Sequence, residues 1–337
     1  MKNKCIAIIG PAFFGYCDAI ALRMSEKGVP TFFINELFSK NKIIRSMIRF
    51  RLGKVFSWLK KTHANRIIST LVEQGVTDVL LISVEDLDSS LIRIVKNMGI
   101  NVHLYMWDGL DRKQNCIHIL NEGVNFSTFD PDDAKKYNCR LINLFAENVY
   151  FSDIVKYEER FNRIAFAGTL HSARPEFIVD LLTRLKNTKY SFGGLLYYPS
   201  KFAFIFKFIL NRRVLSIFPL ISSRAFSKLQ ISELFSMSKF VLDIPFPTQK
   251  GLTSRTFEAL MSGSFLITTI SSIEVLPLSL RSRVLIYKGD TFLQDVDKIS
   301  SANLPELTVD EKYFLSLDRF VDEIFSFMEV LPPLRKL

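Results

Sequence analysis

The segment from Val241 to Thr269, VLDIPFPTQKGLTSRTFEALMSGSFLITT, follows the order strand, polar loop, short helix, strand. Its first residues, Val241–Ile244, form an apolar run that is typical of a buried strand. Pro245 and Pro247 follow at once, and the chain must leave the sheet there because proline cannot donate to a sheet ladder. This order is the repeating unit of a parallel sheet with helices on its faces, so it restricts the fold to the α/β class.

The helix in this segment has recognisable ends. Thr253 or Ser254 can cap its start, and Gly263 can supply the left-handed residue that ends it after about Ser262. A strand over Phe265–Thr269 follows. The helix start is expected to face the sheet edge, where the first amides of a helix attract anions.

Two charged residues lie beside that helix start. Arg255, in the first turn, has a guanidinium that can bind phosphate oxygens in a fork. Glu258, one turn later, can accept hydrogen bonds from the hydroxyls of a ribose. The segment thus predicts a site for a diphosphate attached to a nucleoside. The alternative is an ordinary capped helix on which Arg255 and Glu258 form a surface ion pair.

The same alternation of short strands and helices continues along the chain. In the first half, the predicted strands are Lys4–Ile9, Thr31–Ile34, Asp78–Ser83, Asn101–Trp107, Asn125–Phe129 and Leu141–Phe145, and the helical stretches include Tyr16–Glu26, Arg66–Gln74 and Ser89–Met98. A second series follows the charged segment Ser152–Arg163 and includes Ile164–Gly168, Pro175–Leu185, Ser191–Tyr197, a helix around Ser227–Ser238 and Val284–Lys288. The 337 residues therefore predict two α/β halves joined near Val149–Glu159, with ligands at the carboxyl ends of the strands in a cleft between two facing domains.

Composition excludes several classes of protein. No apolar run approaches the ~20 residues that a spanning helix needs, so a spanning protein is not expected. The first residues predict a β-strand rather than a signal peptide, and hence a cytoplasmic protein. The four cysteines lack CxxC spacing, which indicates reduced thiols: Cys5, Cys17, Cys116 and Cys139. The four histidines form no ligand motif, so a bound metal is not predicted: His63, His103, His118 and His171.

A second loop with site chemistry spans Ala167–Pro175, between a strand and a helix. Gly168 and Thr169 allow the backbone to approach a ligand closely, and His171 and Arg174 supply donors for a diphosphate. A lone histidine in a loop is usually only a surface group, but its position beside an arginine at a strand end favours a role in a site.

The first half offers carboxylates instead. Asp108 follows a predicted strand, where it can act as a general base or simply cap the next turn. Asp130 and Asp133 most simply begin a helix. The glycines of GPAFFGY, residues 10–16, lack GxGxxG spacing, so NAD is not predicted.

Four segments together resemble a known family. WDGLDR around Asp108, FDPDD at Asp130, FAGTLHSARPEFI from Phe166 and DIPFPTQKGLTSRTFEALMSGSFLITT from Asp243 are similar, in that order, to GT-B-fold bacterial glycosyltransferases of the CgeB-like or lipopolysaccharide biosynthesis type. The likeness covers most of Val102–Tyr287, and QKGLTSRTFEAL is its specific part.

The resemblance implies two Rossmann-like domains, an acceptor-side domain over residues 1–153 and a donor domain over residues 154–316. It also implies that residues 317–337, with a helix near Leu317–Glu329, cross back to the first domain, and that no metal or other cofactor is required. The donor-binding set on this interpretation is Gly168, Thr169, Arg174, Lys250, Gly251, Thr253, Ser254, Arg255 and Glu258.

One departure from the family concerns mechanism. Many retaining GT-B enzymes carry two glutamates eight positions apart, and Lys250 stands where the first would be. A lysine there can neutralise the diphosphate of the leaving group. If the reaction inverts the anomeric centre, a base must stand in the first domain; Asp108 is our candidate, with Asp18 in reserve. His171 completes the candidate catalytic set.

The net charge of +10 suggests where the protein works. Residues 38–62 contain no acidic residue and interleave bases with large apolar side chains, as an anionic membrane surface favours. Residues 197–218 form a second such stretch. The alternative is that both are core-packed helices with basic outer faces. Nucleic acid is not predicted, since no recognition motif accompanies the charge.

The sequence therefore predicts a peripheral membrane glycosyltransferase. It would transfer a sugar from a nucleotide-sugar donor to a lipid-linked glycan in O-antigen, lipopolysaccharide or capsule biosynthesis, at the inner face of the cytoplasmic membrane. Two alternatives remain: a nucleotide-sugar epimerase or hydrolase of the same fold, and a non-catalytic partner in polysaccharide assembly.

Overall fold

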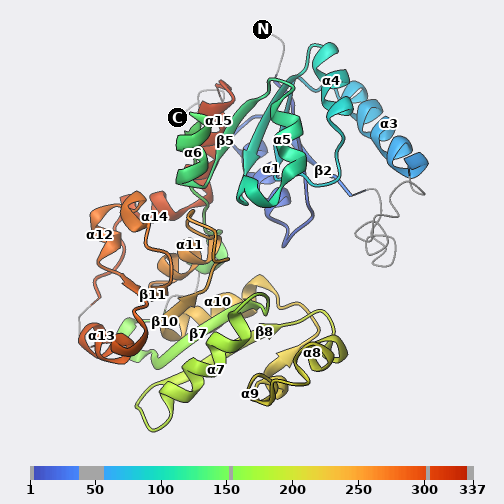
Figure 1. Cartoon of the computed structure of the whole chain (residues 1–337). Helices are drawn as coiled ribbons and strands as arrows, with labels where there is room; N and C mark the ends of the chain where they lie inside the picture. The colour runs from blue at the N-terminus through green and yellow to red at the C-terminus, as the bar shows by residue number, and fades with distance from the viewer. Residues whose placement is uncertain (1–3, 38–56, 152–154, 301–303, 332–337) are drawn as a thin grey trace. The chain divides into compact units, whose positions relative to one another are not determined.

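The computed structural model describes residues 4–37, 57–151, 155–300 and 304–331. The chain forms two compact units: unit 1 contains Met1–Asn143 and Phe320–Leu337, and unit 2 contains Leu144–Arg319. Each unit holds one six-stranded sheet flanked by helices (Figure 1), and all strand pairs found in the described residues are parallel. The predicted α/β class with two Rossmann-like domains is confirmed.

In unit 1 the sheet has the order β2-β1-β3-β4-β5-β6. Its strands are β1 (Ile6–Gly10), β2 (Thr31–Asn35), β3 (Asp78–Ile82), β4 (Asn101–Met106), β5 (Asn125–Thr128) and β6 (Arg140–Leu141). Its helices are α1 (Tyr16–Glu26), α3 (Ser57–Glu73), α4 (Ser89–Asn97), α5 (Gln114–Leu120), α6 (Pro131–Tyr137) and most of α15 (Leu317–Phe327). The central strands are buried along their whole length, as expected for a sheet covered on both faces.

In unit 2 the sheet has the order β12-β11-β10-β7-β8-β9. Its strands are β7 (Phe161–Thr169), β8 (Ser191–Tyr197), β9 (Ile221–Ser222), β10 (Ser238–Asp243), β11 (Phe265–Thr268) and β12 (Val284–Ile286). Its helices are α7 (Arg174–Leu185), α8 (Lys201–Phe208), α9 (Arg212–Leu215), α10 (Lys228–Ser236), α11 (Ser254–Met261), α12 (Leu278–Arg281), α13 (Phe292–Ser300) and α14 (Val309–Leu315).

The helix α15 packs on unit 1. The ring of Phe320 lies 5.2 Å from that of Tyr105 on β4, and Asp322 pairs with Lys27 at 2.6 Å. Arg140 donates to the Ser326 hydroxyl at 2.9 Å. The last described helix therefore packs against the N-terminal part of the chain. Unit 1 is thus built from two distant parts of the sequence.

The segment after α6 departs most from its predicted form. Of the expected strand Leu141–Phe145, only Leu141 belongs to a strand, β6. The first part of unit 1 ends at Asn143, whereas the sequence predicted a domain boundary after residue 153. Ala146 pairs instead with the junction of α14 and α15. Its amide donates to the Leu315 carbonyl at 2.8 Å, and its carbonyl accepts from the Leu317 amide at 3.1 Å. A single apolar run thus serves both units, which its pattern alone could not reveal.

Candidate functional site

The strand order of unit 2 changes direction between β7 and β10. The chain runs outward from β7 to β8 and β9, then returns to β10 on the other side of β7. In open parallel sheets, ligands bind at this switch point, outside the carboxyl ends of the strands. These ends are Thr169 and Asp243, and the two loops that the sequence singled out leave the sheet there. The topology therefore brings both predicted loops to the position where a ligand is expected.

A buried carboxyl holds the start of α11 against the end of β10. The Thr253 hydroxyl donates to Oδ2 of Asp243 at 2.6 Å, and the Thr256 hydroxyl does so at 3.3 Å. Thr253 in turn accepts from the Arg255 amide at 3.1 Å, so Thr253 rather than Ser254 is the helix cap. Burial raises the pKa of Asp243. This network fixes the direction in which the first amides of α11 point.

Arg255 and Glu258 form the ion pair that their spacing suggests, but not on the surface. Nη1 of Arg255 lies 2.5 Å from Oε2 of Glu258, whose side chain is only 1% exposed. The guanidinium carbon of Arg255 lies 5.0 Å from the ring centroid of Phe235 on α10. The surface-pair interpretation is therefore wrong. Because Glu258 is buried, a contact between its carboxylate and a ribose requires this pair to open.

Sequence reasoning missed Tyr150, which lies beside Glu258. Burial and the nearby charge of Glu258 raise the pKa of its hydroxyl, which therefore stays protonated. Tyr150 comes from the segment before β7, far in sequence from α11, and no motif marks it. Only the packing against α10 and α11 shows that it belongs to this cluster.

Arg174, the first residue of α7, joins the two loops of the site. Its Nε donates to the Ile244 carbonyl at 2.7 Å, and its Nη1 donates to the Thr169 carbonyl at 2.9 Å. Burial lowers its pKa to about 10, so it remains charged at neutral pH. A Cβ on Gly168 would lie 3.5 Å from Nη1 of Arg174, and the backbone thus approaches this guanidinium closely. Arg174 is a link between the strand ends as well as a source of positive charge.

The loops also meet through His171. Its ring stacks on that of Phe246, with centroids 3.9 Å apart and planes 6° apart. Its Nδ1 lies 3.3 Å from the Ser172 hydroxyl. Lys250 is exposed and Gly251 is buried, both in the loop that leads to α11. The residues assigned to the donor set therefore come from the end of β7, the first residue of α7, the loop before α11 and the first two turns of α11.

In unit 1, Asp108 follows β4 as predicted. Its carboxylate lies 3.8 Å from Arg112 and 3.6 Å from Lys113. Asp108 does not cap the following turn: the turn Leu110–Arg112 begins at Gly109 with no side-chain cap, and the Leu110 amide donates to Asp133 at 2.9 Å. Asp130 caps α6 by accepting from the amides of the next turn, so its interpretation as a helix start is confirmed.

Sequence reasoning also missed Glu36, directly after β2. Its amide donates to the Gly10 carbonyl at the end of β1, and its Oε2 accepts from the amides of Glu85 at 2.6 Å and Asp86 at 3.0 Å. The residue is 1% exposed, and burial raises its pKa to about 7. The sheet of unit 1 changes direction between β1 and β3, where these groups meet. A carboxylate directly after a strand, the signal that identified Asp108, could have found it.

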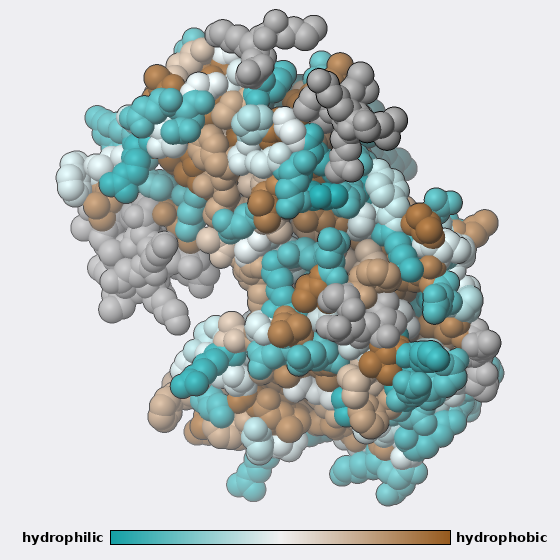
Figure 2. All heavy atoms as spheres, turned by 180° about the vertical axis from the view of Figure 1, so that it is seen from behind, coloured by the Kyte–Doolittle hydropathy of each residue, from teal (hydrophilic) through white to brown (hydrophobic). Residues whose placement is uncertain are grey.

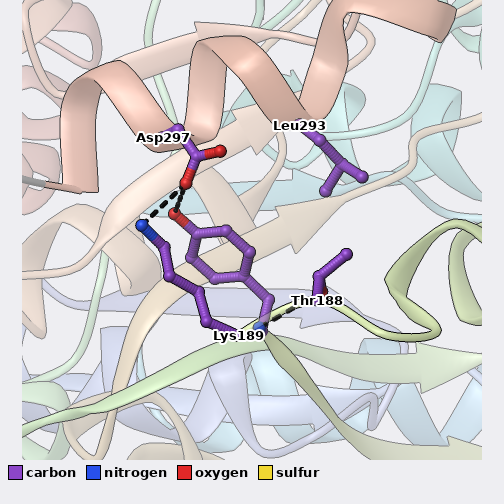
Figure 3. Close-up of a pocket in the computed structure, with 5 residues that line it drawn as sticks. Thr188, Lys189, Leu293 and Asp297 are labelled. Carbon is purple, nitrogen blue, oxygen red and sulfur yellow. Dashed lines mark hydrogen bonds and ion pairs between the residues drawn. The ribbon is translucent and has the colours of Figure 1, made fainter.

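A depression of about 290 Å³ lies elsewhere in unit 2, at the amino end of β8 (Figure 3). Asp297 of α13 pairs there with Lys189 at 2.8 Å and accepts from the Tyr190 hydroxyl at 2.7 Å. These side chains satisfy one another, and the depression is at the edge of the sheet opposite the switch point. It is a structural contact between β8 and α13 rather than part of the candidate site.

Two further findings concern the described residues. No helix among them is long and apolar enough to cross a membrane. No group of three or more His, Cys, Asp or Glu side chains in these ranges could hold a metal ion. Of the basic stretch 38–62, residues 38–56 lie outside the described ranges; residues 57–62 begin α3, where Trp58 is exposed.

No protein-family model matches the sequence, and a search of curated proteins finds no significant match. Solved structures do match. A glycosyltransferase from Rickettsia africae aligns with a TM-score of 0.61 at 11% identity, covering 98% of this chain and all of the other. Anabaena HepE, solved with UDP and glucose, aligns with a TM-score of 0.65 at 8% identity, over 97% of this chain and all of the other. A UDP-GlcNAc 2-epimerase from Methanocaldococcus jannaschii aligns with a TM-score of 0.55 at 11% identity, over 97% and 99%.

These likenesses define the class of fold. The two units are the Rossmann-like halves of the architecture that GT-B glycosyltransferases and UDP-sugar epimerases share. At such low identity the fold is what the comparison shows, and the activity has to be argued from the site.

Proposed function

We propose that this chain is a glycosyltransferase that uses a nucleotide-sugar donor, held mainly by unit 2. The observation that carries the proposal is the convergence of Arg174, Arg255 and the capped start of α11 at the switch point of the sheet. Two guanidinium groups and a helix start attract a diphosphate. Two solved structures of the same fold are named as complexes with UDP, one of them with glucose as well, which agrees with this chemistry.

The chemical roles follow from position. Lys250, exposed in the loop before α11, would neutralise charge that develops on the departing diphosphate. Asp108 in unit 1 would accept the proton of the acceptor hydroxyl. His171 lies in the loop after β7, where its ring stacks on Phe246. From there it would donate a hydrogen bond to the diphosphate. No metal is required on this proposal, because guanidinium, ammonium and amide groups supply the positive charge.

The acceptor is proposed to be a lipid-linked glycan of lipopolysaccharide, O-antigen or capsule, reached by peripheral attachment at the inner face of the cytoplasmic membrane. Support comes from the net charge of +10 and from the two basic, apolar stretches of the sequence. The main alternative is a nucleotide-sugar epimerase, because structures named as UDP-GlcNAc 2-epimerases share the fold. Product formation that depends on an added acceptor separates the two.

The first test is a thermal-shift screen against UDP, GDP, CMP, ADP and their common sugar conjugates. We expect one nucleotide to raise the unfolding temperature, since a ligand that binds only the folded state stabilises it. The shift should be lost in Arg255→Ala. It should persist in Arg224→Ala, which removes an exposed arginine that follows β9, the edge strand two places from β7 in the same sheet.

Because Arg255→Ala removes the cation that pairs with the buried Glu258, Lys250→Ala provides a second variant. Lys250 is exposed, so its loss should leave the unligated unfolding temperature unchanged and weaken the shift. A shift of equal size in all four proteins, or no shift with any nucleotide, would overturn the donor site.

A further inference from the structure

The helices α8 and α9 form a short hairpin between β8 and β9 of unit 2 (Figure 1). One side of α8 is part of the core, where Phe204 and Phe208 are buried. The opposite side carries Phe202 and Phe206, one turn apart, which are 86% and 84% exposed. The chain continues with Ile209 and Leu210, 59% and 97% exposed.

This exposure is concentrated rather than scattered. Single exposed apolar side chains are ordinary, but a group of four on one helix and the turn after it marks a surface that contacts something other than water. Viewed from behind, hydrophobic atoms reach the surface beside hydrophilic ones in the part of the molecule that carries this hairpin (Figure 2).

The charges around these side chains have one sign. Lys201, Lys207 and Arg212 are exposed, and none has an acidic partner among the described residues. Arg213 is different, because it pairs with Asp180 at 2.5 Å. No aspartate or glutamate occurs between Asp180 and Glu233, so no carboxylate of this segment offsets the bases. Apolar side chains ringed by bases match a surface with an apolar interior and anionic head groups.

We propose that this hairpin patch (Lys201, Phe202, Phe206, Lys207, Ile209, Leu210 and Arg212) inserts into the surface of an anionic membrane. The aromatic and aliphatic side chains would enter the head-group region while the three bases contact lipid phosphates. The inference deepens the membrane part of the proposed function, on which it rests, and assigns the contact to a defined element of unit 2. A soluble protein partner is the competing occupant that the test must separate.

The test is flotation of the full chain with lipid vesicles. We expect binding to vesicles that contain phosphatidylglycerol and little to vesicles of phosphatidylcholine alone. Phe202→Glu/Phe206→Glu should lower the partition coefficient about tenfold or more, since it removes apolar area and adds negative charge. The matched control is Leu278→Glu/Val309→Glu, which makes the same charge change at side chains of unit 2 that are 79% and 82% exposed.

A second measurement locates the contact even if another segment also binds lipid. The extra tryptophan fluorescence of Phe206→Trp should be quenched by brominated phosphatidylglycerol, whereas that of Leu278→Trp should not. Equal flotation of the two charge variants, or no quenching at position 206, would overturn the proposal. Nucleotide-dependent thermal shifts, measured on the same variants without lipid, report the donor site separately, so failure of one inference is not failure of the other.

Discussion

The two units carry different ionisable groups at equivalent places in their sheets. In unit 2, the strand ends at the switch point meet the guanidinium groups of Arg174 and Arg255. In unit 1, Glu36 follows β2 and Asp108 follows β4, the two strands that flank β1 and β3 at the switch point. The backbone architecture is the same, so the difference lies wholly in the residues that follow each strand.

This difference fits a division of labour. A cationic edge stabilises a diphosphate, both when it binds and when it leaves. A carboxylate edge can accept a proton from a hydroxyl group. The comparison thus favours a donor at unit 2 and an acceptor at unit 1, and variants at one edge should affect a different step from variants at the other.

The largest expected effect is at the acidic edge. Asp108→Asn should lower kcat for sugar transfer by about 100-fold or more, because the amide cannot accept the proton. The donor-induced thermal shift should be unchanged. Asp111→Asn, an exposed carboxylate in the same turn, is the control and should keep its activity. Steady-state kinetics with both variants provide the measurement, and an unaltered kcat in Asp108→Asn would remove the acidic edge from the mechanism.

The next effect concerns the buried carboxyl of unit 2. Asp243→Ala should lower the stability of β10 and α11 by about 3 kcal/mol, because two hydroxyls lose their acceptor in a buried network. Asp243→Asn keeps a carbonyl oxygen and should cost less. Hydrogen–deuterium exchange should speed up in β10 and α11 and remain unchanged in β1 and β3. Unaltered exchange throughout would mean that the network does not hold the helix start.

Glu36 should make stability depend on pH in unit 1. Its pKa is raised by burial to about 7, above its ordinary value, so the folded protein holds a proton there that the unfolded chain has lost. The resulting stability is fully present below about pH 4, near the unfolded pKa, and is lost as pH rises through 7, by on the order of 3 kcal/mol.

Glu36→Gln keeps an oxygen that can accept from the amides of Glu85 and Asp86 but does not titrate. Relative to the natural protein, this variant should therefore gain stability as pH rises from 4 to 8. Denaturant unfolding at several pH values checks this. Unfolding is followed by hydrogen–deuterium exchange of the backbone amides in β1 and β3. A difference between the two proteins that is independent of pH would contradict the assignment.

The smallest effect separates helix capping from donor binding. Thr253→Ala and Thr308→Ala remove the caps of α11 and α14 in the same unit, and each should cost about 1 kcal/mol of stability. Only Thr253→Ala should also raise the KM for the donor, because the amides of α11 face the switch point. Equal KM values in the two variants would indicate that the start of α11 is structural only.

Much of the fold follows from local pattern. The predicted helix Tyr16–Glu26 and strand Ser191–Tyr197 match α1 and β8, and the strand at Phe265 is correct to one residue. These elements are bounded by turn residues and caps, whose effects act over a few positions. The strand predicted over Leu141–Phe145 is regular only at its first residue. Ile142 still donates to the Thr128 carbonyl of β5, but the Leu144 carbonyl accepts from Arg319, far along the chain.

The candidate site divides in the same way. The sequence by itself determined that a capped helix with Arg255 in its first turn follows a buried strand, since hydrophobic pattern, proline and capping residues specify those features locally. Only the tertiary structure decided that Asp243 holds the cap, that Phe246 stacks on His171 and that Glu36 is buried. The physical reason is that parallel strands collect residues from distant segments at one edge, and burial and pairing exist only once those segments meet.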